Sequence, residues 1–99
     1  MRRLSKEESR QRYAEARKLW NKFDPIGVAD MIDDEYDSYV GPTIRAAEAG
    51  VQAKLIEYVT RAVCENMGLS ATGELKMAIN SFAAEFMEWY RSRWADTVV

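Results

Sequence analysis

Histidine is absent from this sequence, and cysteine occurs only once, as Cys64. Without histidine the chain has no Ser-His or Cys-His nucleophilic pair and lacks the commonest general base. A single cysteine without histidine also excludes the usual zinc sites. A lone cysteine forms no internal disulfide, which is typical of proteins in a reducing compartment. We therefore expect a cytoplasmic protein without a cofactor.

Long apolar runs are also missing, and glycine and proline are few, with 5 and 2 residues. No run approaches the roughly 20 apolar residues of a membrane span, so we expect no membrane insertion. The N-terminal arginines are not followed by an apolar segment, so we expect no secretory signal there. What remains is a chain of 99 residues with 47% hydrophobic and 30% charged residues. This balance predicts one globular domain over residues 1–99.

Apolar residues recur at spacings of three and four, which predicts an all-α fold. A capping box at Ser5 and Glu8 marks the first helix start, and no segment alternates with period two, so we predict no strand. Short connections favour a compact four-helix bundle-like domain. The predicted helices run from about 5 to 23, from 33 or 34 to about 49, from about 52 to 67, and from about 73 to 95.

Gly41 and Pro42 fall inside the second predicted helix. Proline lacks the backbone N–H that a helix interior needs, so the helix is either bent there or broken, with Pro42 opening a new piece. We favour a continuous but bent helix. After the third helix, Gly68 and Leu69 predict a left-handed glycine stop with Leu69 folded back on the last turn.

Three segments together resemble a family of small bacterial all-α proteins of unknown function. That family carries the motifs W-N-x-W/F-D-P-I-G-V, D-E-Y-D-x-Y and M-G-L, which match here at 20–28, 34–39 and 67–69. The resemblance covers about residues 13–69, and the last helix lies outside it. It implies an all-helical fold and a bacterial source, and it implies no activity.

The first candidate site is the corner that follows the first helix. It can be a binding loop, with aromatic anchors and a polar contact from Asp24. Alternatively, Asp24 caps neighbouring amides while Trp20, Ile26 and Val28 close the end of the bundle. We favour the second interpretation, because a tight turn between apolar residues usually forms a corner. The candidate residues of this corner are Trp20, Phe23, Asp24, Pro25 and Gly27.

Tyr36 and Tyr39 stand three residues apart among acidic residues. A tyrosine–aspartate proton relay is one interpretation of this pair. We favour rings in the core whose hydroxyls form hydrogen bonds at its edge, for example to Asp24 or Arg45.

Acidic residues are concentrated after the first helix: six occur from Phe23 to Asp37, with no basic residue among them. Their oxygens can hold Mg²⁺ or Ca²⁺, although the spacing is not that of an EF-hand loop. Acidic side chains at the start of a helix also complement its dipole, and we favour this second interpretation. The weak metal candidates are Asp30, Asp33, Asp34 and Asp37.

Basic residues are concentrated in the first 22 residues, where eight are interrupted by three acidic residues. A nucleic-acid-binding domain usually has a clear basic excess. The net charge of the whole chain is −2, so we do not expect nucleic acid as a partner.

The last predicted helix carries three large aromatic residues, Trp89, Tyr90 and Trp94. Aromatic side chains are enriched in interfaces, so these residues either form a surface for a protein partner or a second copy, or belong to a helix buried on two sides.

We expect a non-enzymatic bacterial protein-interaction module that binds a protein partner or forms a homo-oligomer. An immunity-type protein that neutralises a toxin is one alternative. A small carboxylate-dependent or metal-dependent enzyme that uses the acids of residues 30–37 is another.

Overall fold

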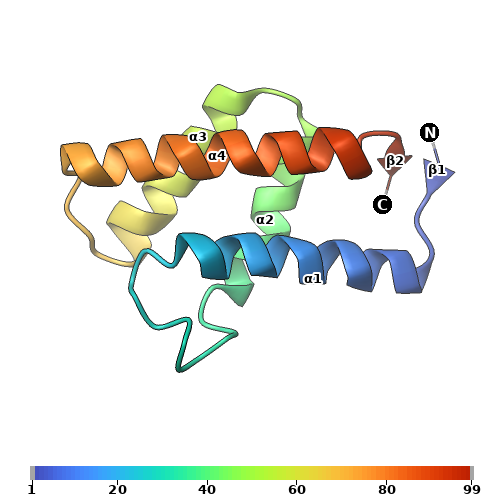
Figure 1. Cartoon of the computed structure of the whole chain (residues 1–99). Coiled ribbons are helices and arrows are strands. Elements are labelled where there is room, and N and C mark those ends of the chain that lie inside the picture. The colour runs from blue at the N-terminus through green and yellow to red at the C-terminus, as the bar shows by residue number, and fades with distance from the viewer. Residues whose placement is uncertain (1, 99) are drawn as a thin grey trace.

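The computed structural model describes residues 2–98 and confirms the all-α prediction. Helical segments make up almost all of the regular structure (Figure 1). A single π-helical turn directly continues the third helix. The helical elements are α1 (Lys6–Phe23), α2 (Asp37–Glu48), α3 (Gln52–Arg61), η1 (Ala62–Asn66) and α4 (Gly73–Arg93).

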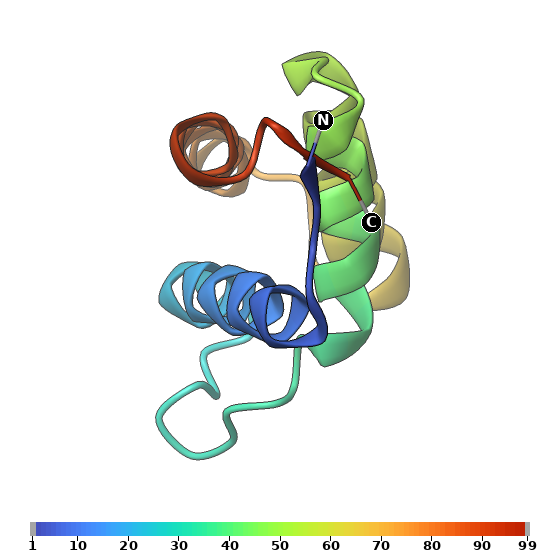
Figure 2. The ribbon, with the colours of Figure 1, turned by 90° about the vertical axis from the view of Figure 1, so that its right-hand side faces the viewer.

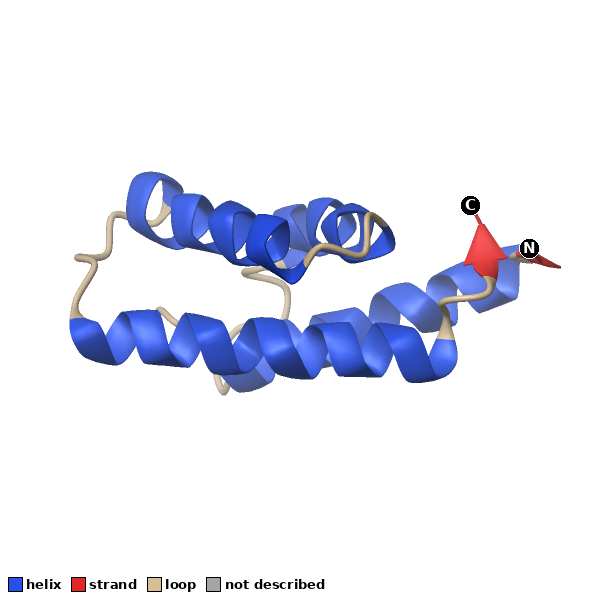
Figure 3. Cartoon of the chain, turned by 90° about the horizontal axis from the view of Figure 1, so that it is seen from above, coloured by secondary structure: helices blue, strands red, loops and turns tan. Residues whose placement is uncertain are grey.

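The helices form two layers that share one core (Figures 2 and 3). The two longest helices, α1 and α4, lie side by side and run in opposite directions (Figure 1). The shorter helices α2 and α3 form the second layer and contact each other and α4. This layering leaves the α1–α2 connection, residues 24–36, projecting from one side of the bundle.

Local signals set most helix ends where the sequence predicts them. The Ser5 hydroxyl accepts a hydrogen bond from the Glu8 amide while the Glu8 carboxylate accepts from the Ser5 amide, both at 3.1 Å. These two bonds satisfy amides that a helix start leaves unpaired. At the end of η1, Gly68 has a φ of +76°, and the N–H of Leu69 bonds to the Val63 carbonyl at 3.1 Å.

The second helix starts later than predicted, at Asp37 instead of Asp33 or Asp34. The acidic residues before it resemble a first helical turn, but they belong to the connection, whose other contacts hold it in an irregular path. The helix then continues unbroken through Pro42, so the alternative of a helix divided at Gly41-Pro42 is wrong.

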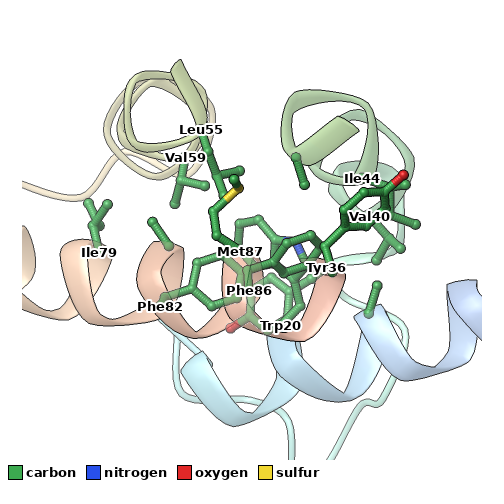
Figure 4. Close-up of a cluster of buried hydrophobic side chains, with 14 of the residues drawn as sticks. Trp20, Tyr36, Val40, Ile44, Leu55, Val59, Ile79, Phe82, Phe86 and Met87 are labelled. Carbon is green, nitrogen blue, oxygen red and sulfur yellow. The ribbon is translucent and has the colours of Figure 1, made fainter. Parts of the chain in front are cut away.

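The core lies between the two layers, with Trp20 near its centre (Figure 4). The Trp20 ring lies 4.8 Å from Phe82 and 5.6 Å from Tyr36, measured between centroids. Aliphatic side chains of the second layer, among them Leu55 and Val59, complete the packing. Burial of these side chains is the main force that joins the helices, of which α2 and α3 are too short to be stable alone.

The two ends of the described chain pair with each other, which the sequence did not predict. The strands β1 (Arg2–Arg3) and β2 (Thr97–Val98) are parallel, with Arg2 opposite Thr97. A two-residue strand is too short for alternation to show in the sequence. Among the described helices, none has the length and apolar character needed to cross a bilayer.

Candidate functional site

The α1–α2 connection begins at a corner built on Asp24. This residue ends α1 in the left-handed conformation, with φ of 45°, and its amide bonds to the Trp20 carbonyl at 2.8 Å. One carboxylate oxygen, Oδ1, then accepts hydrogen bonds from three backbone amides at 2.9–3.2 Å. Asp24 therefore caps its neighbours, as the structural interpretation of this corner expects. The donors are the backbone N–H groups of Gly27, Val28 and Ala29.

Tyr36 joins the end of the connection to its start. Its hydroxyl donates to Oδ1 of Asp24 at 2.7 Å and accepts from the Ile26 amide at 3.0 Å. Burial, together with the hydrogen bond to Asp24, raises the pKa of Tyr36 to about 12. The hydrogen bond from Tyr36, with those from the amides, lowers the pKa of Asp24. Tyr36 therefore keeps its proton at neutral pH, and its hydrogen bond to Asp24 holds the two ends of the connection together.

Of the aromatic residues proposed as anchors at this corner, Trp20 belongs to the core. Its ring is fully buried, and its Nε1 donates to the Thr43 hydroxyl of α2 at 3.0 Å. Phe23 is half-buried and stacks on Phe82, with ring centroids 4.7 Å apart. Tyr39 is also half-buried and lies 5.7 Å from Trp20. These side chains position the connection, and Trp20 is not available to a ligand.

The connection presents apolar side chains to solvent, which the sequence pattern does not reveal. Met31 is 77% exposed, Ile32 43% and Ile26 41%. The expectation that Ile26 closes the end of the bundle is therefore wrong, because its amide is held by Tyr36 and its side chain is turned outward. The acidic residues Asp30, Asp33, Asp34 and Glu35 of the same connection are exposed as well.

The acidic residues proposed as metal ligands do not gather. Asp37 pairs with Arg17 of α1 through two bonds, at 2.9 and 2.5 Å, and Asp33 contributes its backbone carbonyl to Asn21 at 3.0 Å. Within residues 2–98 no three histidine, cysteine or carboxylate side chains lie close enough to hold a metal ion. Asp30, Asp33 and Asp34 are instead exposed in the same connection as Met31 and Ile32.

The aromatic residues of α4 are core residues rather than an exposed interface. Tyr90 and Trp94 are only 5% and 4% exposed, and Trp89 is half-buried. Trp89 and Trp94 both donate their indole N–H to Oε1 of Glu15, at 2.9 and 3.1 Å. Of the two interpretations of these aromatic residues, the helix buried on two sides is the one that fits.

Glu15 joins α1 to the end of α4, a role that the sequence did not predict. Besides the two indoles, it accepts two hydrogen bonds from the Arg93 guanidinium, at 2.9 and 2.6 Å. Burial raises the pKa of Glu15, but the hydrogen bonds from Arg93, Trp89 and Trp94 outweigh it, so the pKa is lowered. A glutamate in the middle of an amphipathic helix gives no signal of such a role, because its partners are more than 70 residues away in the chain.

The chain matches no protein-family model, and neither curated proteins nor solved structures give a significant match.

Proposed function

We propose that this protein is a non-enzymatic interaction module that binds a basic, partly apolar surface of another protein through residues 26–35. We name this segment the docking loop. The observation that carries the proposal is that the docking loop combines exposed Met31 and Ile32 with four exposed acidic side chains. Interfaces typically combine a few apolar anchors with a polar rim.

The distribution of exposed apolar side chains supports the choice of this surface. Among the described residues, five large hydrophobic side chains are exposed, and three of them lie in the docking loop. The other two, Val51 and Met77, lie apart, at the start of α3 and on α4. Single exposed apolar residues are ordinary, whereas several in one short segment point to an interaction.

The docking loop is also held in place before a partner arrives. Tyr36 and Asp24 fix its base, Asn21 holds the Asp33 carbonyl, and the Val28 carbonyl accepts from the amides of Met31 and Ile32 at 3.0 and 2.8 Å. A loop that is already ordered loses less conformational entropy on binding. Its acidic side chains would steer a basic partner, so association should slow as salt is added.

A toxin-neutralising role is one form of this proposal, and a toxin gene beside this one would support that form. The alternative of a carboxylate-dependent or metal-dependent enzyme has less support, since the acids of residues 30–37 do not converge within the described chain.

The test is photo-crosslinking in the source cells, with a crosslinking amino acid at Met31 and, as a matched control, at Met77, which is 72% exposed on α4. The single cysteine favours a reducing compartment, so cytoplasmic partners are sought. We expect one protein to crosslink at position 31 and not at 77. Equal adducts at both positions, or none at 31, would contradict the proposal.

The partner found in this way then allows a binding measurement with purified proteins. The double variant Met31→Ala and Ile32→Ala should weaken binding by about tenfold or more, as expected for truncated apolar anchors. Met77→Ala should leave the affinity unchanged. If both variants bind as tightly as the natural chain, the docking loop is not the contact surface.

A further inference from the structure

A second surface feature lies away from the docking loop, in a hollow of about 280 Å³ between α1 and α2. This volume is close to the lower limit of small-molecule pockets, so it suits a small group with a few waters. Ile44 lines it from the core side. The polar and glycine lining consists of Ser9, Arg12 and Tyr13 of α1 and Gly41, Arg45 and Glu48 of α2.

Arg12 brings a buried positive charge to this hollow. Its side chain is 8% exposed, and Nη1 donates to Oε1 of Glu48 at 3.1 Å. The Nε of Arg12 is buried, and no acceptor among the described residues satisfies it. A buried N–H without an acceptor costs about 1–3 kcal/mol, so this guanidinium has capacity for another oxygen.

Arg45 brings a second guanidinium from the opposite helix. Its side chain folds back along α2, so that Nη1 lies 3.6 Å from the place where a Cβ on Gly41 would stand. Glu48 already pairs with Arg12, which leaves the charge of Arg45 uncompensated within the lining. Because Gly41 adds no side chain to the hollow, the Arg45 guanidinium lies directly over the backbone of α2 there.

We propose that this hollow binds a small oxyanion, a phosphate or carboxylate group, between Arg12 and Arg45. Arginine presents planar, paired N–H donors that match such oxygens, and charge-assisted bonds of this kind are the stronger class of hydrogen bonds. The Ser9 hydroxyl supplies a further donor on the α1 side, whereas the Tyr13 hydroxyl is already committed to the Asp37 carbonyl at 2.7 Å. The site is independent of the docking loop, since the two share no residue.

The test is a titration of the full chain, labelled with ¹⁵N, in which the arginine Nε–Hε signals are followed by NMR. The probes are inorganic phosphate and acetate, each compared with chloride at equal ionic strength. We expect the signals of Arg12 and Arg45 to shift and saturate with phosphate, with acetate, or with both, and the arm that saturates identifies the oxyanion. Shifts that remain linear, or that equal those in chloride, in both arms would overturn the proposal.

Three variants make the outcome specific. Arg45→Gln should weaken binding by about tenfold, the loss expected for removing one charged hydrogen-bonding partner. Gly41→Leu should abolish binding by filling the hollow; leucine favours helix, and its Cβ meets only Nη1 of Arg45, at 3.6 Å. Arg61→Gln is the control, since Arg61 is exposed on α3 and paired with Glu57. Saturation that is unchanged in Arg45→Gln would place the anion elsewhere and overturn the proposal.

Discussion

The carboxylate of Glu15 ties the first helix to the last. It accepts the indole N–H groups of Trp89 and Trp94 and the guanidinium of Arg93. The two indoles are buried or half-buried, so loss of their acceptor leaves polar groups without a partner in a place that water reaches poorly. The contribution of Glu15 therefore comes mainly from satisfying buried donors and less from its ion pair.

Replacing Glu15 with alanine should lower the free energy of unfolding by about 2–3 kcal/mol, because two indole donors lose their acceptor. Glu85→Ala is the matched control, since Glu85 also joins α4 to α1, through an exposed ion pair with Lys22 at 2.8 Å. That exposed pair should contribute less than about 1 kcal/mol. Urea unfolding followed by tryptophan fluorescence measures both losses, and equal losses would contradict this account of Glu15.

Individual residue roles were predictable where a local contact decides them. Asp24 was expected to cap amides, and the hydroxyls of Tyr36 and Tyr39 to bond to groups such as Asp24 or Arg45. Asp24 does cap, Tyr36 does bond to Asp24, and both contacts lie within 12 residues of chain. The burial of Trp20 agrees with the favoured interpretation of the corner. The burial of Trp94 was left open, because a helix with aromatic residues on more than one face does not show which face meets another helix.

At the scale of single elements, α2 is the helix with the most unusual composition. It carries Gly41 and Pro42 in its interior and no side-chain cap at its start. Glycine costs a helix about 1 kcal/mol relative to alanine. Proline removes the N–H that would bond to the Ser38 carbonyl. The helix persists because Val40, Thr43, Ile44 and Ala47 are buried in the core.

Gly41→Ala should raise the free energy of unfolding by about 0.5–1 kcal/mol, because alanine loses less backbone freedom on folding. An added Cβ meets only the Arg45 guanidinium, at an ordinary 3.6 Å. Gly68→Ala serves as the opposite control, since its φ of +76° should make alanine destabilising by about 1–2 kcal/mol. Thermal unfolding compares the two, and a loss of stability in Gly41→Ala would show that the glycine is needed for packing.

Helix ends divide into those that local chemistry determines and those that tertiary contacts determine. Ser5 and Gly68 act through bonds within a few residues, so the sequence predicts these ends. The start of α2 is set differently, because Asn21 and Tyr36 hold the docking loop in a path that delays the helix until Asp37. The periodicity of the sequence does not reveal these tertiary contacts. The exposure of Met31 and Ile32 depends on the path that they impose, so it was not predicted either.

For the whole molecule, two carboxylates make the free energy of unfolding depend on pH in the acidic range. The pKa values of Asp24 and Glu15 are both lowered in the folded chain by hydrogen bonds to their charged forms. A lowered pKa contributes stability above the ordinary value of about 4, and this contribution is lost as the pH falls through the folded value. Protonation of both groups would loosen the docking loop and the α1–α4 contact together.

The free energy of unfolding should therefore fall steadily from about pH 5 to pH 2, the range over which such carboxylates gain protons. Asp24→Asn should be less stable than the natural chain at pH 7 and should lose less stability on acidification, because it has no charge to lose. Urea unfolding at a series of pH values gives both curves. Parallel curves for the two proteins would mean that Asp24 does not contribute to the acid dependence.

The parallel pairing of β1 with β2 has a practical consequence. Arg2 lies opposite Thr97, and paired strands are only about 5 Å apart, so the chain enters and leaves the fold at nearly one point. Figure 1 places that point at the opposite end of α1 from residues 24–36. Because β1 and β2 run in the same direction, a segment that joins their outer ends has only the length of two residues to turn back along. The same geometry allows the chain to be closed into a ring with a short linker.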